Sequence, residues 1–376
     1  MKIAVLKETA PGETRCAAIP ETVKKFIALG ADVAVETGSG TNAGITDADF
    51  EAAGATTGAR RAVLDGAGII LGVDGPDPQS LSGASKGALL VGALDPLRRS
   101  EAIQGYAKAG LQALAMEWMP RITRAQSMDM LSSQSNLAGY KAVIDGAAAY
   151  GRAFPMMMTA AGTVSPAKAF VMGVGVAGLQ AIATAKRLGA QVSATDVRSA
   201  TREQIQSLGA KAIFVENVTG IEGEGQGGYA SEMSEEYRKA QAELVSGHIA
   251  KQDIVITTAL IPGKPAPRLI SDAQIATMRP GSVIVDLAAD AGGNVEGCVA
   301  GQSVQKHGVT IIGASNLARS LPADASALFA RNLYNFLSAF WDKEKNGPEL
   351  PDDDEIVKAI RLTRDGKVVN ERLASS

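Results

Sequence analysis

The stretch Lys168–Leu188, KAFVMGVGVAGLQAIATAKRL, restricts the possible folds more than any other part of the chain. A short apolar run, Ala169–Met172, has the length of a strand, and the residues from Leu179 onward have the composition of a helix. Between them lie three glycines spaced as G-x-G-x-x-G, which are Gly173, Gly175 and Gly178. The first glycine permits a tight strand-to-helix turn, the second lets backbone approach a pyrophosphate, and the third lets helix and strand touch.

A carboxylate follows at a matching distance. A second apolar run, Gln191–Thr195, ends in Asp196, about 20 residues beyond the glycines. An acid there accepts hydrogen bonds from the adenosine ribose, while the helix N-terminus offers N–H groups to the phosphates. Strand, glycines, helix and acid in register therefore predict a dinucleotide site. The alternative is an ordinary βαβ turn that binds no ligand.

Size and composition narrow the class of protein further. A chain of 376 residues is long enough for two domains. A net charge of −3 does not suggest nucleic acid as a partner. Two distant cysteines, Cys16 and Cys298, indicate neither a disulfide framework nor a metal site. The N-terminus is typical of a strand rather than a signal peptide, and the longest uncharged run, Ala169–Ala185, is too short to span a bilayer. We therefore expect a soluble cytoplasmic protein without a metal.

Apolar runs alternate with helical stretches along most of the chain, which is typical of parallel sheets covered by helices. The expected strands are Lys2–Val5, Asp32–Val35, Gly68–Leu71, Ala88–Val91, Leu111–Ala115, Lys211–Phe214, Ile254–Thr257, Val283–Asp286 and Val309–Ile312. The expected helices include Glu21–Leu29, Asp47–Ala53, Pro96–Ala109, Thr201–Leu208, Glu235–Ile249 and Leu328–Phe340. The fold class is α/β, with two doubly wound Rossmann-like domains separated by a cleft. We predict an N-terminal domain of 1–131 plus 314–376 and a nucleotide-binding domain of 132–313.

Two stretches interrupt this alternation. Met119–Tyr140 is polar, and we interpret it as a loop and helix start that bridges the domains, with Ser135 or Asn136 capping a helix over Leu137–Tyr150. Residues 216–228 are glycine-rich and acidic, which predicts a mobile loop or, alternatively, a tolerated surface insertion.

The C-terminus carries a turn signal. Ile356–Leu362 and Lys367–Val369 flank an Asp-Gly pair, which predicts a hairpin with a type I′ turn.

Acid–base groups are scarce. Dehydrogenases that act on an alcohol or amine usually place His or Lys at the substrate. The chain has only two histidines, His248 and His307, and neither lies near the polar stretch in sequence. The sequence therefore predicts a protein that holds a nicotinamide cofactor but has few groups for substrate proton transfer.

Four long segments carry a family resemblance: RITRAQSMDMLSSQSNLAGYKAVIDGA, FPMMMTAAGTVSPAKAFVMGVGVAGLQAIATAKRLGA, ATDVR and TTALIPGKPAP. They resemble the NAD(H)-binding component of proton-translocating nicotinamide nucleotide transhydrogenase, a relative of alanine dehydrogenase. The resemblance implies three components: a soluble part that binds NAD(H), a membrane part that conducts protons, and a soluble part that binds NADP(H). It implies that this chain is the first of these as a separate subunit, that it forms a homodimer, and that its partners hold it at the inner membrane.

The resemblance also implies site residues. Those expected around the nicotinamide and its ribose are Arg121, Ile122, Gln126, Asp129 and Ser132, of which Arg121, Gln126 and Asp129 are the catalytic candidates. Those expected at the pyrophosphate are Gly173, Val174, Gly175, Val176 and Gly178, and those at the adenosine are Asp196, Val197 and Arg198. Leu260 would border the cofactor, and Gly228 and Tyr229 match a loop that closes over it. The alternative is that the polar residues only cap helices and fill a wet cleft between the domains.

Comparison with alanine dehydrogenase helps to distinguish a transhydrogenase subunit from a stand-alone dehydrogenase. The positions of that enzyme's catalytic His and substrate Lys align with Leu90 and Gly72, while Arg15 is retained as a structural remnant. The missing His favours direct hydride transfer from NADH to NADP⁺ on a partner. The alternatives are a stand-alone amino- or keto-acid dehydrogenase and a non-catalytic NAD-binding module.

Overall fold

The computed structural model describes residues 1–215, 235–261 and 263–374. The chain divides into two compact units: unit 1 is 1–134 with 319–376, and unit 2 is 135–318. The predicted boundaries, after residues 131 and 313, lie a few residues before these divisions. The predicted roles of Gly228 and Tyr229 fall outside the described residues.

Unit 1 is built on a six-stranded sheet in the order β3-β2-β1-β4-β5-β6, in which every pair is parallel. Its strands are β1 (Lys2–Val5), β2 (Asp32–Glu36), β3 (Thr56–Gly58), β4 (Ile69–Asp74), β5 (Leu89–Ala93) and β6 (Gln112–Ala115). Ile3 and Val5 of β1 join one apolar cluster, whereas Ala4 joins another. Because successive side chains of a strand point to opposite faces, this sheet is buried on both sides.

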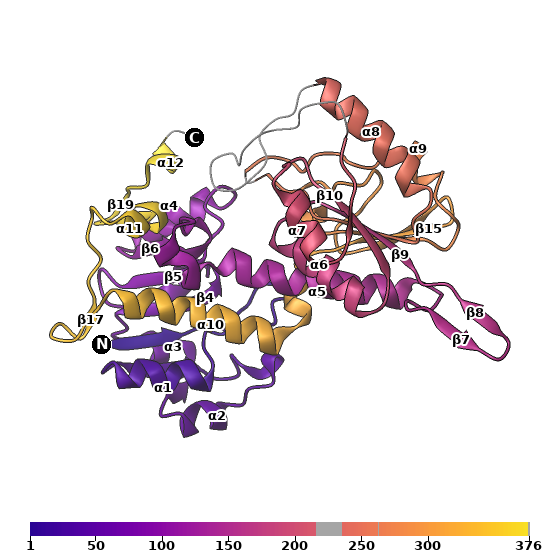
Figure 1. The fold of residues 1–376 in the computed structure, drawn as a ribbon. Helices are drawn as coiled ribbons and strands as arrows, with labels where there is room; N and C mark the ends of the chain where they lie inside the picture. The colour runs from indigo at the N-terminus through magenta and orange to yellow at the C-terminus, as the bar shows by residue number, and fades with distance from the viewer. Residues whose placement is uncertain (216–234, 262, 375–376) are drawn as a thin grey trace. The chain divides into compact units, whose positions relative to one another are not determined.

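Helices cover both faces of this sheet (Figure 1). They are α1 (Pro20–Ala28), α2 (Asp47–Ala52), α3 (Arg60–Leu64) and α4 (Ser100–Lys108), together with the C-terminal α10 (Pro322–Ala339), α11 (Glu355–Ile360) and α12 (Glu371–Ala374). Helix α10 buries Phe329, Leu333 and Phe336 in the same cluster as Ile3 and Val5. The C-terminal segment therefore completes the N-terminal core.

Unit 2 has a seven-stranded sheet in the order β11-β10-β9-β12-β13-β15-β14. Its strands are β9 (Lys168–Met172), β10 (Gln191–Thr195), β11 (Lys211–Ala212), β12 (Ile254–Thr257), β13 (Val283–Asp286), β14 (Ser303–Lys306) and β15 (Val309–Gly313). Its helices include α6 (Val176–Arg187), α7 (Thr201–Ser207), α8 (Glu235–Ile249) and α9 (Asp272–Ile275). All pairs are parallel except β14 with β15, an antiparallel edge that the sequence analysis did not predict. The predicted α/β class is confirmed.

Two local predictions need correction. Helix α5 (Met130–Ala149) begins well before the predicted Leu137, so neither Ser135 nor Asn136 caps it. Residues predicted as the strand Ile356–Leu362 instead form α11, because Asp354 caps it and its apolar residues recur at helical spacing. The turn itself is confirmed: Asp365 and Gly366, both with positive φ, join β18 (Thr363–Arg364) to β19 (Lys367–Val368).

An unpredicted hairpin, β7 (Met157–Thr159) with β8 (Gly162–Val164), extends from the rest of unit 2 (Figure 1). None of the helices in the described part of the chain has the length and apolar character needed to cross a membrane.

Candidate functional site

The glycine turn between β9 and α6 has the geometry that its spacing predicts. Gly173 adopts a φ of +99°, which favours glycine, and a Cβ there would lie 2.6 Å from Thr258 Oγ1. A Cβ on Gly178 would lie 1.9 Å from the carbonyl oxygen of Gly173, closer than any side chain can approach. Both glycines are therefore required for helix α6 to pack against the end of β9.

Gly175 has a different role. It is the N-cap residue of α6, its backbone is extended, and a Cβ built on it would meet nothing within 4 Å. No side chain caps the first turn of this helix in the part of the chain described. Among the described residues the first-turn N–H groups are therefore left without a capping side chain, and together with the positive end of the helix dipole they suit a phosphate group.

Asp196 ties the end of β10 to this turn. Its side chain is 7 % exposed, and its Oδ2 accepts a hydrogen bond of 2.7 Å from the backbone N–H of Val174. Arg198 donates to Oδ1 through its backbone N–H and Nε, both at 2.9 Å, and to Oδ2 through a terminal guanidinium nitrogen at 3.1 Å. A carboxylate has about four acceptor positions, so Arg198 and Val174 use the capacity that a ribose would need.

The remaining described candidates of unit 2 follow strand ends or begin α6. Val197 stands between Asp196 and Arg198, and Val176 opens α6. Leu260 follows β12, the neighbour of β9, and is 44 % exposed.

Sequence reasoning did not identify Asn294, which holds the loop carrying Leu260. It is 0 % exposed; its Oδ1 accepts from the N–H of Ala259, and its Nδ2 donates to the carbonyls of Ala259 and Pro267. An asparagine gives no local sequence signal for such a role, because its three contacts come from a segment that is distant along the chain.

The candidates of unit 1 lie on or beside a short 3₁₀ helix, η4 (Thr123–Met128), and at the start of α5. Ala125 and Met128 are buried and anchor η4 in the apolar cluster, whereas Gln126 between them is exposed. Ile122, just before η4, is partly buried against the same cluster, and Arg121 is exposed. The predicted polar residues thus stand on a segment whose apolar side is fixed.

Asp129 and Ser132 bind each other. Asp129 precedes the first residue of α5, and its carboxylate accepts from the N–H of Ser132 at 3.0 Å and from its hydroxyl at 2.6 Å. These two bonds make Asp129 the side-chain cap of α5. A capping role leaves a role at the nicotinamide untested, because capping uses only some of the carboxylate's acceptor positions.

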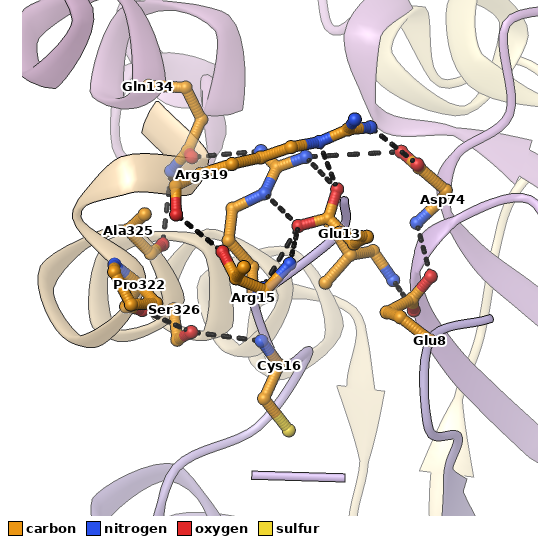
Figure 2. Close-up of polar contacts among 12 residues, drawn as sticks. Glu8, Glu13, Arg15, Cys16, Asp74, Gln134, Arg319, Pro322, Ala325 and Ser326 are labelled. Atoms are coloured by element: carbon orange, nitrogen blue, oxygen red, sulfur yellow. Dashed lines mark hydrogen bonds and ion pairs between the residues drawn. The ribbon is translucent and has the colours of Figure 1, made fainter. Parts of the chain in front are cut away.

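Arg15 lies in a buried cluster of charges (Figure 2). It donates to both oxygens of Glu13 at 2.8 Å and to Gln134 Oε1 at 3.0 Å, while Arg319 pairs with Glu13 and Asp74. Burial acts to raise the pKa of Glu13, but the hydrogen bonds and charge of Arg15, with Arg319, outweigh it and hold that pKa below its usual value. These contacts agree with a structural role for Arg15.

The two histidines have partners elsewhere. His248 Nε2 lies 2.8 Å from Ser193 Oγ, its ring packs edge-on against Phe170, and burial lowers its pKa. His307 Nε2 lies 3.0 Å from Asp272 Oδ1. Among the described residues, no three or more His, Cys, Asp or Glu side chains are grouped so that they could hold a metal ion.

These features define a Rossmann-type protein whose glycine turn presents an open helix N-terminus. Residues 4–138 match the family described as "Alanine dehydrogenase/PNT, N-terminal domain", and residues 142–371 match its C-terminal domain. The chain belongs to the alanine dehydrogenase/PNT family.

Its similarity is greater to transhydrogenase subunits than to alanine dehydrogenases. It is 53 % identical to an NAD(P) transhydrogenase alpha subunit of Rhodospirillum rubrum, over 99 % of each chain. It is 30 % identical to alanine dehydrogenase of Halomonas elongata, over 100 % of this chain and 96 % of the other. The crystal structure of transhydrogenase from Sinorhizobium meliloti has a TM-score of 0.88 and 52 % identity, covering 98 % of this chain and 100 % of that one. The predicted resemblance is confirmed.

Proposed function

We propose that this chain is the NAD(H)-binding subunit of a proton-translocating transhydrogenase. It holds NADH while a hydride passes directly to NADP⁺ on a partner component, and a membrane-spanning component couples the exchange to proton movement. The observation that carries the proposal is the glycine turn, where Gly175 leaves room for a phosphate beside an uncapped helix N-terminus. The identity to transhydrogenase subunits supports the choice within the family.

The glycine turn supplies the anchor for the cofactor. The backbone of Gly173, Val174, Gly175 and Val176 would face the pyrophosphate, and Gly178 keeps α6 close enough for this. Asp196, Val197 and Arg198 would hold the adenosine, with Leu260 at the border. In this structure the guanidinium of Arg198 is paired with the carboxylate of Asp196. The guanidinium therefore has to move before ribose hydroxyls can donate to both carboxylate oxygens.

The polar residues of unit 1 are assigned to the reacting end. Arg121, Ile122, Gln126, Asp129 and Ser132 would surround the nicotinamide and its ribose. The cofactor itself supplies the hydride, and exchange between two nicotinamides requires no proton to be added to or taken from a substrate. Gln126 and Asp129 would then act by orienting the two nicotinamides and bringing them close together. A rigidly anchored segment can provide both.

The proposal also includes a homodimer and a membrane-spanning partner. On the β7–β8 hairpin and just before it, Met156, Met157 and Met158 are 60, 43 and 78 % exposed. An apolar row on a protruding hairpin supports a homodimer, because exposed apolar side chains gain by burial against a second copy. The chain is then cytoplasmic and held at the inner membrane through its partner subunits.

The test compares three activities of the purified chain. Titration of its fluorescence with NADH measures binding, and an added NADP(H)-binding component reports hydride exchange through an NADH analogue. We expect binding alone without the partner, exchange with it, and no turnover of alanine or pyruvate. Oxidation of a small amino acid would support a stand-alone dehydrogenase, and binding without exchange under any partner would support a regulatory module.

A further inference from the structure

One backbone carbonyl of η4 accepts hydrogen bonds from two side-chain amides. Asn332 Nδ2 and Asn335 Nδ2, both on α10, each donate to the carbonyl oxygen of Ser127 at 2.9 Å. Residues three apart on a helix lie on the same face, so both amides can reach one acceptor. The two bonds use both lone pairs of that carbonyl, which fixes the direction of the Ser127–Met128 peptide, one residue beyond Gln126.

A third side chain orients the first amide. Ser133, in the first turn of α5, donates from Oγ to Asn332 Oδ1 at 2.8 Å. Asn332 is 7 % exposed, and this bond leaves its Nδ2 directed at Ser127. The three side chains therefore join η4, α5 and α10 at one point within unit 1.

The chain on the N-terminal side of Gln126 also has an anchor. Arg124 pairs with Asp354, the cap of α11, with nitrogen–oxygen distances of 2.8 and 3.0 Å. Gln126 thus stands, exposed, between two residues whose positions are set by the C-terminal segment. Both anchors belong to unit 1, whereas the glycine turn and Asp196 belong to unit 2, so loss of an anchor can affect one end of the proposed site without the other.

We infer that Asn332 and Asn335 are positioning residues for hydride transfer, which act by holding the Ser127 carbonyl and so orienting Gln126 and Asp129. The inference rests on the proposed function. A shift of about 1 Å in a reacting geometry can slow a reaction about 100-fold. Loss of these two amides should therefore lower the rate of transfer while leaving the adenosine anchor, and most of the NADH affinity, unchanged.

The experiment uses the full chain with its NADP(H)-binding component and saturating nucleotides. Asn335→Ala should slow hydride exchange about 3-fold, because Asn332 still donates, and the Asn332→Ala/Asn335→Ala double variant should slow it about 30-fold. The dissociation constant for NADH should change less than about 2-fold. Ser338→Ala is the matched control, since Ser338 lies half-buried on the same helix and donates to the carbonyl of Asn335.

A double-mutant cycle distinguishes a positioning role of Asn335 from a general contribution to the stability of the fold. In a Gln126→Ala background, Asn335→Ala should slow the remaining exchange less than it slows exchange in the wild type, because the part of its effect that passes through Gln126 is already lost. Equal losses of exchange and NADH binding, additive effects in the cycle, or unchanged exchange in the double variant would each overturn the inference. Failure of the wild-type chain to exchange hydride with any NADP(H) component would instead overturn the proposed function, and the inference with it.

Discussion

The two groups of candidate residues are built in different ways. The glycine turn of unit 2 is local: its required contacts lie among Gly173, Gly178 and the neighbouring strand ends, and they are made mainly by backbone. The η4 segment of unit 1 depends on asparagines 205 and 208 positions further along the chain. A site formed by the backbone of one short motif depends little on individual side chains and can be recognised from sequence. A site held by distant side chains can instead be altered by single substitutions.

The variant with the largest expected effect tests whether the glycine turn depends on close backbone contacts. Gly178→Ala should lower the free energy of unfolding by about 3 kcal/mol, because its Cβ would overlap the Gly173 carbonyl. Gly175→Ala is the matched variant: it should change stability by less than about 0.5 kcal/mol and weaken NADH binding at least about tenfold, since its Cβ enters the space assigned to the pyrophosphate. Urea unfolding and NADH titration measure the two effects, and wild-type NADH binding by Gly175→Ala would contradict the assignment.

A second prediction concerns the pKa of a carboxylate in unit 1, Glu8. Glu8 accepts from the N–H groups of Val73 and Asp74, and burial raises its pKa to about 7. Because the folded state holds this proton more tightly than the unfolded chain, its contribution to stability is complete below about pH 4.5 and is lost as pH rises through about 7.

Urea unfolding between pH 4.5 and 7.5 checks this prediction against Glu8→Gln. The stability of wild type relative to the variant should grow by about 2 kcal/mol as pH falls across that range. The pKa of Glu117 is also raised to about 7 by burial, so the variant keeps part of the pH dependence. A constant difference between the two proteins would show that Glu8 does not contribute.

The third prediction concerns nucleotide choice at Asp196. A carboxylate repels a 2′-phosphate and accepts hydrogen bonds from a 2′-hydroxyl, and we expect this preference to outweigh the attraction of the neighbouring Arg198 for a phosphate. NADH should therefore bind at least tenfold more tightly than NADPH, a difference of about 1.4 kcal/mol. Parallel fluorescence titrations measure this, and equal affinities would rule out the role given to Asp196.

The smallest expected effect separates the two possible roles of Asp129. Asp129→Ala should lose about 1 kcal/mol of stability with the cap of α5, whereas Asp129→Asn keeps a capping side chain and should lose little. Both variants should slow hydride exchange far more than they weaken NADH binding. If Asp129→Asn transfers hydride at the wild-type rate, then the residue serves only as a cap.

Predictions from sequence succeeded where patterns are contiguous. The strands Lys2–Val5, Gln191–Thr195, Ile254–Thr257 and Val283–Asp286 were placed to the residue. The errors came where a short apolar run fits two structures. Ile356–Leu362 could be a strand or a helix, and the cap at Asp354 decided for a helix. The start of α5 was misplaced because its cap is Asp129, which lies in a stretch that is polar throughout.

The sequence by itself determined the parallel α/β architecture and the glycine turn, because hydrophobic period and glycine spacing act over a few residues. It also determined the family, whose motifs are contiguous. Only the tertiary structure decided that Arg198 saturates Asp196, that Arg15 lies in a buried ion cluster, and that Asn332 and Asn335 hold the Ser127 carbonyl. Those contacts depend on the directions of individual side chains, which no spacing in the sequence specifies.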